Sequence, residues 1–171
     1  MTGTDVHIPT LTTERLILRA PQKADFEAYC AFMTSDRSHI PDPNVRTVWH
    51  LFATEFFGWC LNGIGHWIIA LKNGPAIGVT GLSHPAYYPE PEMGWALYDG
   101  FEGQGYATEA ARAARGWASG KITSLVSYIA PGNARSVAVA RRLGAWEDPE
   151  ATLPTGTLAA QCSVFRHWGD S

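Results

Sequence analysis

The stretch Glu92-Met-Gly-Trp-Ala-Leu-Tyr-Asp-Gly-Phe-Glu-Gly-Gln-Gly-Tyr-Ala-Thr-Glu-Ala110 decides the fold class of this 171-residue chain. A strand that reads as buried covers 92–97 and runs into a loop with glycines, which leads directly into an alanine-rich helix from Ala107 to about Gly120. The first N–H groups of such a helix have no partner within the helix. Together with the helix dipole they form an anion site that suits a pyrophosphate.

The loop glycines Gly103 and Gly105 allow a ligand to approach the backbone, because neither carries a Cβ. A flexible turn before a helix would use the same residues, so Gly-x-Gly alone leaves both interpretations open. Two other phosphate motifs are excluded. The chain has no Gly-Lys-Ser/Thr of a P-loop, and residues 103–108 lack the third glycine of a dinucleotide fingerprint.

The flanking sequence supplies further strands and helices. Strands are predicted over 13–19, 66–71, 76–82 and 122–130, helices over 25–33, 45–61 and 133–143, and a final strand pair between 158 and 167. This order indicates an α/β (mixed α+β) protein in which a mixed sheet carries helices on both faces. No repeat or long linker divides the chain, so we expect a single domain over 1–171 with a loose tail over 1–10.

Composition excludes several classes of protein. Thirteen Lys and Arg against sixteen Asp and Glu give a net charge of −3, which argues against nucleic-acid binding. Cys30, Cys60 and Cys162 form no CxxC pair, so neither a disulfide framework nor a metal site is predicted. The N-terminus lacks a signal-peptide layout, and no apolar run approaches the ~18 residues of a membrane span. We therefore expect a cytoplasmic protein without a membrane partner.

Three blocks, in this order and spacing, resemble the GNAT superfamily of N-acetyltransferases, and more narrowly its ribosomal-protein N-acetyltransferase-like branch. They are Thr13-Glu-Arg-Leu-Ile-Leu-Arg19, the stretch from Glu92 to Ala110, and Ala130-Pro-Gly-Asn-Ala-Arg-Ser-Val-Ala-Val-Ala-Arg-Arg-Leu-Gly144. The resemblance implies a GNAT-like fold with a mostly antiparallel sheet of six to seven strands and splayed central strands. It also implies transfer of the acetyl group of acetyl-CoA, as co-substrate, to an amine.

The resemblance also assigns cofactor-binding residues. The loop amides would bind the CoA pyrophosphate; they belong to Gly103, Gln104, Gly105, Tyr106 and Ala107, with Thr108 beside them. Backbone groups of Trp95 and Leu97 would pair with the pantetheine arm like a strand, and a free strand N–H would polarise the thioester carbonyl. Asn133 is predicted to cap the helix that follows it, and the resemblance adds a hydrogen bond from Asn133 to the CoA arm.

Glu102 departs from the family pattern, which usually has Gln or Arg three residues before the second loop glycine. A carboxylate near a pyrophosphate is unfavourable unless it turns to solvent or pairs with a cation such as Arg135 or Arg141. Glu102 therefore favours an alternative function, that of a non-catalytic CoA-binding regulatory module with the same fold.

Two residues are candidates for the chemistry. Glu92, at the start of its strand, could accept the proton of the attacking ammonium, although a surface glutamate at a strand end has the same pattern. Ser136 could protonate the departing CoA thiolate, or simply bond the local backbone at the helix start. We expect direct attack in a ternary complex, without an acyl-enzyme. The acceptor amine, a small molecule or a protein N-terminus, stays open, as does a homodimer.

Overall fold

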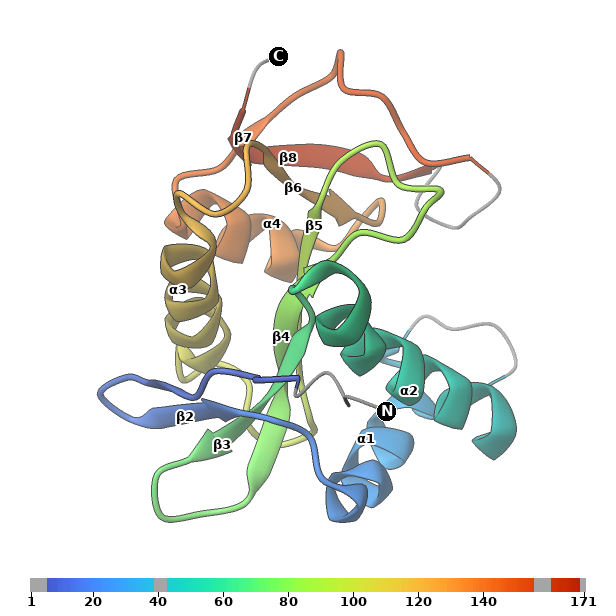
Figure 1. Ribbon diagram of the computed structural model, residues 1–171, viewed down its shortest axis with the longest axis vertical. Coiled ribbons are helices and arrows are strands. Elements are labelled where there is room, and N and C mark those ends of the chain that lie inside the picture. The colour runs from blue at the N-terminus through green and yellow to red at the C-terminus, as the bar shows by residue number, and fades with distance from the viewer. Residues whose placement is uncertain (1–5, 39–42, 156–160, 170–171) are drawn as a thin grey trace, which may run out of the picture.

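The computed structural model describes residues 6–38, 43–155 and 161–169, and the strands described form one eight-stranded sheet (Figure 1). In sheet order these strands are β1 (Leu11–Thr12), β2 (Leu16–Arg19), β3 (His66–Leu71), β4 (Ala76–Ser83), β5 (Glu92–Leu97), β6 (Leu125–Ile129), β8 (Ser163–Trp168) and β7 (Trp146–Glu147). Every neighbouring pair is antiparallel except β5 and β6. The mostly antiparallel sheet was predicted; the two-residue strands β1 and β7 raise the strand count above the predicted six to seven.

Helices cover both faces of the sheet, as the alternation of elements predicted. They are the short 3-10 helix η1 (Lys23–Asp25), α1 (Phe26–Met33), α2 (Val45–Asn62), α3 (Tyr106–Ala118) and α4 (Ala134–Arg142). In Figure 1, α3 and α4 lie on one side of β4, and α1 and α2 lie on the other. The two sides contain separate groups of buried side chains, so the sheet is a middle layer between two pairs of helices.

The two helix pairs pack differently because their sequences differ. Four alanines of α3 are fully buried against the sheet (Ala110, Ala111, Ala114 and Ala118). Small side chains let the helix axis lie close to the strands, which brings the start of α3 near β5. In α2, large apolar residues recur every three or four positions (Val48, Phe52, Phe56 and Trp59), and all four are buried. The amphipathic helix predicted there is confirmed.

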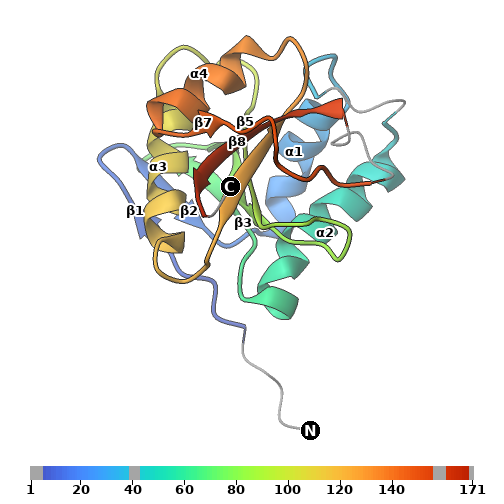
Figure 2. The same cartoon turned by 90° about the horizontal axis from the view of Figure 1, so that it is seen from above.

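The centre of the sheet opens between β5 and β6. These parallel strands are in register at one position only, Glu92 opposite Val126. Beyond it, the Ser127 hydroxyl donates a 2.6 Å hydrogen bond to the carbonyl oxygen of Met93. The Ser127 side chain thus occupies a backbone acceptor of β5 that a continuing parallel ladder would use, and β5 and β6 diverge from this point. Figures 1 and 2 show β6 and β8 running across the end of β5 rather than alongside it, so the predicted splay is confirmed.

Two terminal predictions need correction. Within the predicted loose tail, Ile8 packs against the core and the Pro9 carbonyl accepts a 2.7 Å hydrogen bond from the Trp67 indole, so this part is attached; residues 1–5 lie outside the described residues. The final strand pair was placed between 158 and 167, but β8 pairs with β7 at residues 146–147. Residues 156–160 also lie outside the described part.

Candidate active site

A cavity of about 230 Å³ lies where β5 and β6 diverge. It brings together four residues that the sequence proposed for separate roles: Glu92, Trp95, Asn133 and Ser136. Further walls come from Met93 and Gly94, from residues 127–130 of β6 and the turn after it, and from Ser38 and Cys162. Leu97 and the loop residues 103–108 are not part of this lining.

Glu92 has the electrostatic environment of a proton acceptor. Its carboxylate folds back over Gly94, with Oε1 3.5 Å from the position that a Cβ on that glycine would occupy. The Ser83 hydroxyl donates a 3.0 Å hydrogen bond to Oε2. Burial raises the pKa of Glu92 to about 7, although His66 and the Ser83 hydrogen bond oppose the shift. A carboxyl group with this pKa exchanges its proton near neutral pH.

His66, on β3, belongs to the surroundings of Glu92. Its ring lies over Gly81, and its Nδ1 is 3.3 Å from a carboxylate oxygen of Glu55 on α2. Burial opposes protonation of this imidazole, but the charge and hydrogen bonding of Glu55, with a contribution from Glu92, raise the pKa of His66. His66 is therefore a buried histidine beside Glu55, and its charge is coupled to that of Glu92.

Glu90 lies two residues before Glu92, and its carboxylate is held in an ion pair with Arg166. Its two carboxylate oxygens accept hydrogen bonds of 2.6 and 2.9 Å from Arg166 on β8, and Arg166 also donates a 2.5 Å bond to Asp148. The hydrogen bonds from Arg166 lower the pKa of Glu90 below its ordinary value, although burial opposes this. The Glu90–Arg166 ion pair therefore links the segment before Glu92 to β8, on the other side of the opening between β5 and β6.

One edge of β5 faces the opening. The Tyr98 N–H donates to Ile77 on β4, whereas the Met93 carbonyl accepts from Ser127 on β6. Because successive residues of a strand direct their backbone groups to opposite sides, those of Trp95 and Leu97 point to the same side as Met93. This is the side on which β6 has moved away.

Asn133 and Ser136 meet at the start of α4. The Asn133 side-chain oxygen accepts a 3.1 Å hydrogen bond from the Ser136 N–H, so Asn133 caps the helix as the sequence predicted. This bond uses the backbone N–H of Ser136, and Ser136 is one of the residues that line the cavity. A second hollow, bordered by Gly132, Val137 and Arg141, shares Asn133 and follows the surface of α4.

The loop before α3 has the geometry of an anion site. Gly103 and Gly105 adopt φ of 77° and 81°, a left-handed conformation that residues with a side chain rarely take. The Glu109 backbone N–H donates a hydrogen bond to the Gly105 carbonyl and closes the first turn of α3. The preceding amides, over 106–108, project from the helix end, and the N-cap Gly105 has no side chain to accept from them.

A family model of the acetyltransferase (GNAT) domain matches residues 15–145 of this chain. The chain belongs to the GNAT acetyltransferase family. It is 41% identical to an acetyltransferase from Agrobacterium tumefaciens, whose crystal structure matches with a TM-score of 0.86 over 97% of this chain and 98% of that one. Membership makes the protein an acetyl-CoA-dependent acetyltransferase, as the resemblance implied.

More distant structures share the fold. A ribosomal L7/L12 α-N-protein acetyltransferase, RimL, solved with coenzyme A, is 18% identical with a TM-score of 0.67, covering 92% of this chain and 95% of that one. The microcin C7 self-immunity acetyltransferase MccE, solved with acetyl-CoA and AMP, is 15% identical with a TM-score of 0.65, covering 90% and 91%. The ribosomal-protein branch suggested by the sequence is thus among the structural neighbours of this acetyltransferase.

Arg15 is a residue of the acetyltransferase site that sequence reasoning missed. Its guanidinium donates a hydrogen bond of 3.0 Å to the carbonyl of Gln104 and one of 2.7 Å to the carboxylate of Glu109. The same guanidinium lies 4.5 Å from the ring centroid of Tyr106. Because a trans peptide is planar, a Gln104 carbonyl directed at Arg15 turns the Gly105 N–H the opposite way. The only sequence signal was the Thr13–Arg19 block, which was interpreted as a strand.

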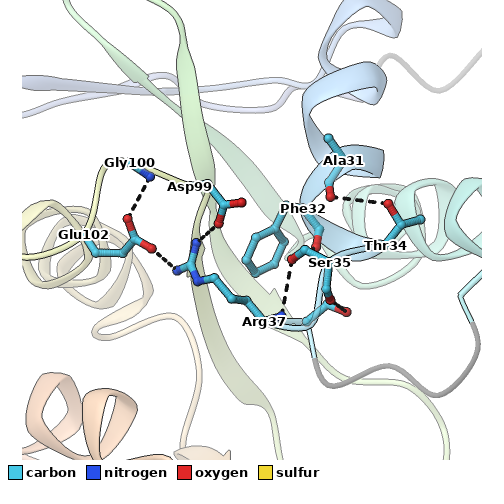
Figure 3. Close-up of polar contacts among 9 residues, drawn as sticks. Ala31, Phe32, Thr34, Ser35, Arg37, Asp99, Gly100 and Glu102 are labelled. Carbon is cyan, nitrogen blue, oxygen red and sulfur yellow. Dashed lines mark hydrogen bonds and ion pairs between the residues drawn. The ribbon is translucent and has the colours of Figure 1, made fainter.

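Glu102 has a cationic partner other than the arginines of α4 that were considered. Figure 3 shows the Arg37 guanidinium between the carboxylates of Asp99 and Glu102, with 2.7 Å to Glu102. The other oxygen of Glu102 accepts a 2.9 Å hydrogen bond from the Gly100 N–H. The carboxylate that breaks the family pattern of the acetyltransferase is therefore paired and supports its own loop.

Ser127, which lines the cavity of the acetyltransferase, has its hydroxyl 3.0 Å from Nε2 of His167 on β8. Since Ser127 donates its proton to Met93, it must accept from His167 Nε2, the reverse of nucleophile activation. Burial lowers the pKa of His167 to about 4, which keeps the ring neutral. This pair therefore holds the strand opening and does not supply an acyl-enzyme nucleophile.

Two further findings concern the described residues of the acetyltransferase. None of its helices within 6–38, 43–155 and 161–169 is long and apolar enough to cross a bilayer. The same part of the chain holds no cluster of three or more His, Cys, Asp or Glu side chains arranged for a metal ion.

Proposed function

We propose that this acetyltransferase transfers the acetyl group of acetyl-CoA to a primary amine by direct attack in a ternary complex. The acceptor would be a small molecule or a protein N-terminus. The observation that carries the proposal is the cavity at the strand opening. It is lined by Glu92, a carboxyl with a pKa of about 7, by residues of β5 whose outward edge faces it, and by Ser136.

The cofactor would follow the surfaces described above. Its pyrophosphate would bind the amides of the loop Gly103, Gln104, Gly105, Tyr106 and Ala107, beside Thr108. Its pantetheine arm would pair with the outward backbone groups of Trp95 and Leu97. The Asn133 oxygen already caps α4, so its amide nitrogen is the group that would donate to the arm. Coenzyme A in RimL and acetyl-CoA in MccE support a CoA thioester as the ligand of this fold.

The chemistry then needs proton transfers away from the attacking nitrogen, before and after attack, and a proton transfer to the leaving sulfur. Ionised Glu92 takes a proton from the acceptor ammonium, and the neutral amine attacks the thioester carbonyl. A β5 N–H stabilises the oxyanion as the carbon becomes tetrahedral. The C–S bond breaks, the electron pair leaves with sulfur, and the attacking nitrogen gives its second proton to water, which leaves a neutral amide. Ser136 protonates the thiolate and recovers a proton from water, and Glu92 returns its proton to solvent. Most of the rate enhancement comes from proximity and the polarised carbonyl.

The alternative of a non-catalytic regulatory module rested on Glu102, a carboxylate that the sequence puts near a pyrophosphate unless it turns to solvent or pairs with a cation. Arg37 pairs with that carboxylate, so the argument against cofactor binding loses its basis. The name of RimL describes a protein acceptor, which supports a protein N-terminus without excluding a small amine.

Acetyl-CoA with a panel of amines tests the proposal, with release of free CoA thiol as the readout. The panel includes polyamines, amino acids and peptides with free N-termini. We expect at least one amine to accelerate thiol release, and acetyl-CoA to raise the melting temperature. Gly105→Glu fills the loop and adds negative charge, so it should abolish the thermal shift. Equal binding by this variant would overturn the loop assignment, and thiol release that no amine accelerates would overturn amine transfer.

A further inference from the structure

We infer that Arg37 is a positioning residue that couples the cofactor loop to the wall of the acceptor cavity. It would do so by holding Glu102 away from the bound pyrophosphate and by linking residues 34–38, which follow α1, to the turn after β5. The inference rests on the proposed placement of acetyl-CoA.

Arg37 joins two parts of the chain that are far apart in sequence. It follows α1, and its guanidinium reaches Asp99 and Glu102 in the turn between β5 and α3 (Figure 3). The same guanidinium lies 5.4 Å from the ring centroid of Phe32, whose ring is 5.9 Å from that of Tyr98. Ionic and aromatic contacts thus connect the end of α1 to the end of β5.

The segment that carries Arg37 has a defined shape. The Ser35 hydroxyl donates a 2.6 Å hydrogen bond to the Phe32 carbonyl and accepts one from the Arg37 N–H. The Ser38 hydroxyl donates a 2.7 Å hydrogen bond to the Met33 carbonyl. Ser38 lines the cavity that contains Glu92. A movement of the Arg37 anchor therefore changes the position of a wall of the proposed reaction site.

Charge explains the second role of Arg37. Glu102 immediately precedes Gly103, where the anion-binding loop begins. With Arg37 present, one cation faces two carboxylates; without it, the turn carries two uncompensated negative charges. A released Glu102 could turn toward the pyrophosphate, and the repulsion would be only partly screened by solvent and salt.

A double-mutant cycle on acetyl-CoA affinity tests this coupling. Arg37→Met keeps the aliphatic stem over Phe32 and should weaken affinity by roughly three- to tenfold, with a smaller deficit at high salt. Glu102→Gln keeps an acceptor for the Gly100 N–H and should change affinity less than about twofold, because the charge is already paired. In the Arg37→Met background, the same change should restore near-wild-type affinity. Arg112→Met, on the exposed surface of α3, is the matched control.

Two results would overturn the charge role: wild-type affinity in Arg37→Met, or an equal effect of Glu102→Gln in both backgrounds. Thermal melting without ligand confirms that each variant is folded, and Arg37→Lys should have an intermediate affinity because one ammonium reaches one carboxylate at a time. If the wild type itself fails to bind acetyl-CoA, the proposed function falls. If the wild type binds acetyl-CoA and the double-mutant cycle shows no coupling between Arg37 and Glu102, only this inference falls.

Hydrogen exchange tests the link to the cavity wall without an acceptor. Acetyl-CoA should slow amide exchange over residues 34–38 in the wild type, because ordering the cofactor loop stabilises the Arg37 contact. The same addition should leave these amides unchanged in Arg37→Met. Equal protection in both proteins, or none in the wild type, would overturn the link.

Discussion

Replacement of Glu92 by Gln tests the proposed chemistry most directly, because one substitution removes basicity and little else. Gln has nearly the same size, and its oxygen can still accept from Ser83, which donates a 3.0 Å bond to the carboxylate. At pH values where Glu92 is protonated, the variant is close to isosteric with the native side chain. Folding and acetyl-CoA affinity should therefore stay near wild type, and the loss should appear in turnover.

The magnitude follows from the pKa of about 7 that burial gives Glu92. Such a group is ionised in about 9% of molecules at pH 6 and about 91% at pH 8, so wild-type kcat should rise roughly tenfold over this range. Loss of a general base typically costs about 10²-fold or more. Glu92→Gln should thus be slower by about that factor at pH 7. Its deficit should shrink at higher pH, where more of the acceptor amine is already neutral.

The assay is thiol release at saturating acetyl-CoA and amine from pH 5.5 to 9.5, for wild type and variant in parallel. Acetyl-CoA affinity is measured separately, so that a binding defect cannot pass for a chemical one. Near-wild-type turnover of Glu92→Gln at pH 7 would refute the reasoning. It would leave proximity and the β5 N–H as the whole catalytic apparatus.

Three further outcomes are expected. Ser83→Ala removes a hydrogen bond that opposes the raised pKa of Glu92, so the rise of kcat should move to higher pH; a profile that stays in place would exclude this role. Ser136→Ala should lower kcat by less than Glu92→Gln, because water can protonate many thiolates, and cofactor affinity should hold; an effect confined to acetyl-CoA Kd would assign Ser136 to binding. Arg15→Met frees the carbonyl of Gln104 and should weaken acetyl-CoA binding severalfold in isothermal titration, whereas unchanged affinity would show that the loop keeps its shape unaided.

Most of the fold was predictable because the local patterns agree with the tertiary structure. The predicted ranges 66–71 and 92–97 coincide with β3 and β5, and the ends of the long helices lie within two residues of the predicted ones. The exceptions are short strands. β7 has two residues, too few for a recognisable alternation, and pairs with β8 across an intervening segment, so only the folded chain reveals it.

The site was predictable where backbone geometry sets it and less so where long side chains do. The turn glycines and the Asn133 cap follow from local rules, and Gly105 and Asn133 have the conformation and cap bond that these rules require. Arg15 and Arg37 reach the loop 89 and 65 residues away in sequence, to Gln104 and Glu102. No local pattern specifies such a reach, because it depends on how β2 packs against α3 and on where the end of α1 lies relative to the turn after β5.

The divergence of β5 and β6 has a consequence for association as well as for ligand binding. An unpaired strand edge is normally a hazard, since it can template pairing with other chains. Here the edge is internal: β6 closes one end of the gap at Glu92 and Val126, and the serine bond to Met93 bars the next acceptor. A strand of another molecule would have to enter a gap that narrows to the point where β5 and β6 meet. A thin, flexible chain that carries amides can lie along the exposed edge of β5 instead. The protein can therefore keep open hydrogen-bonding groups in the middle of its sheet without offering a polymerisation surface.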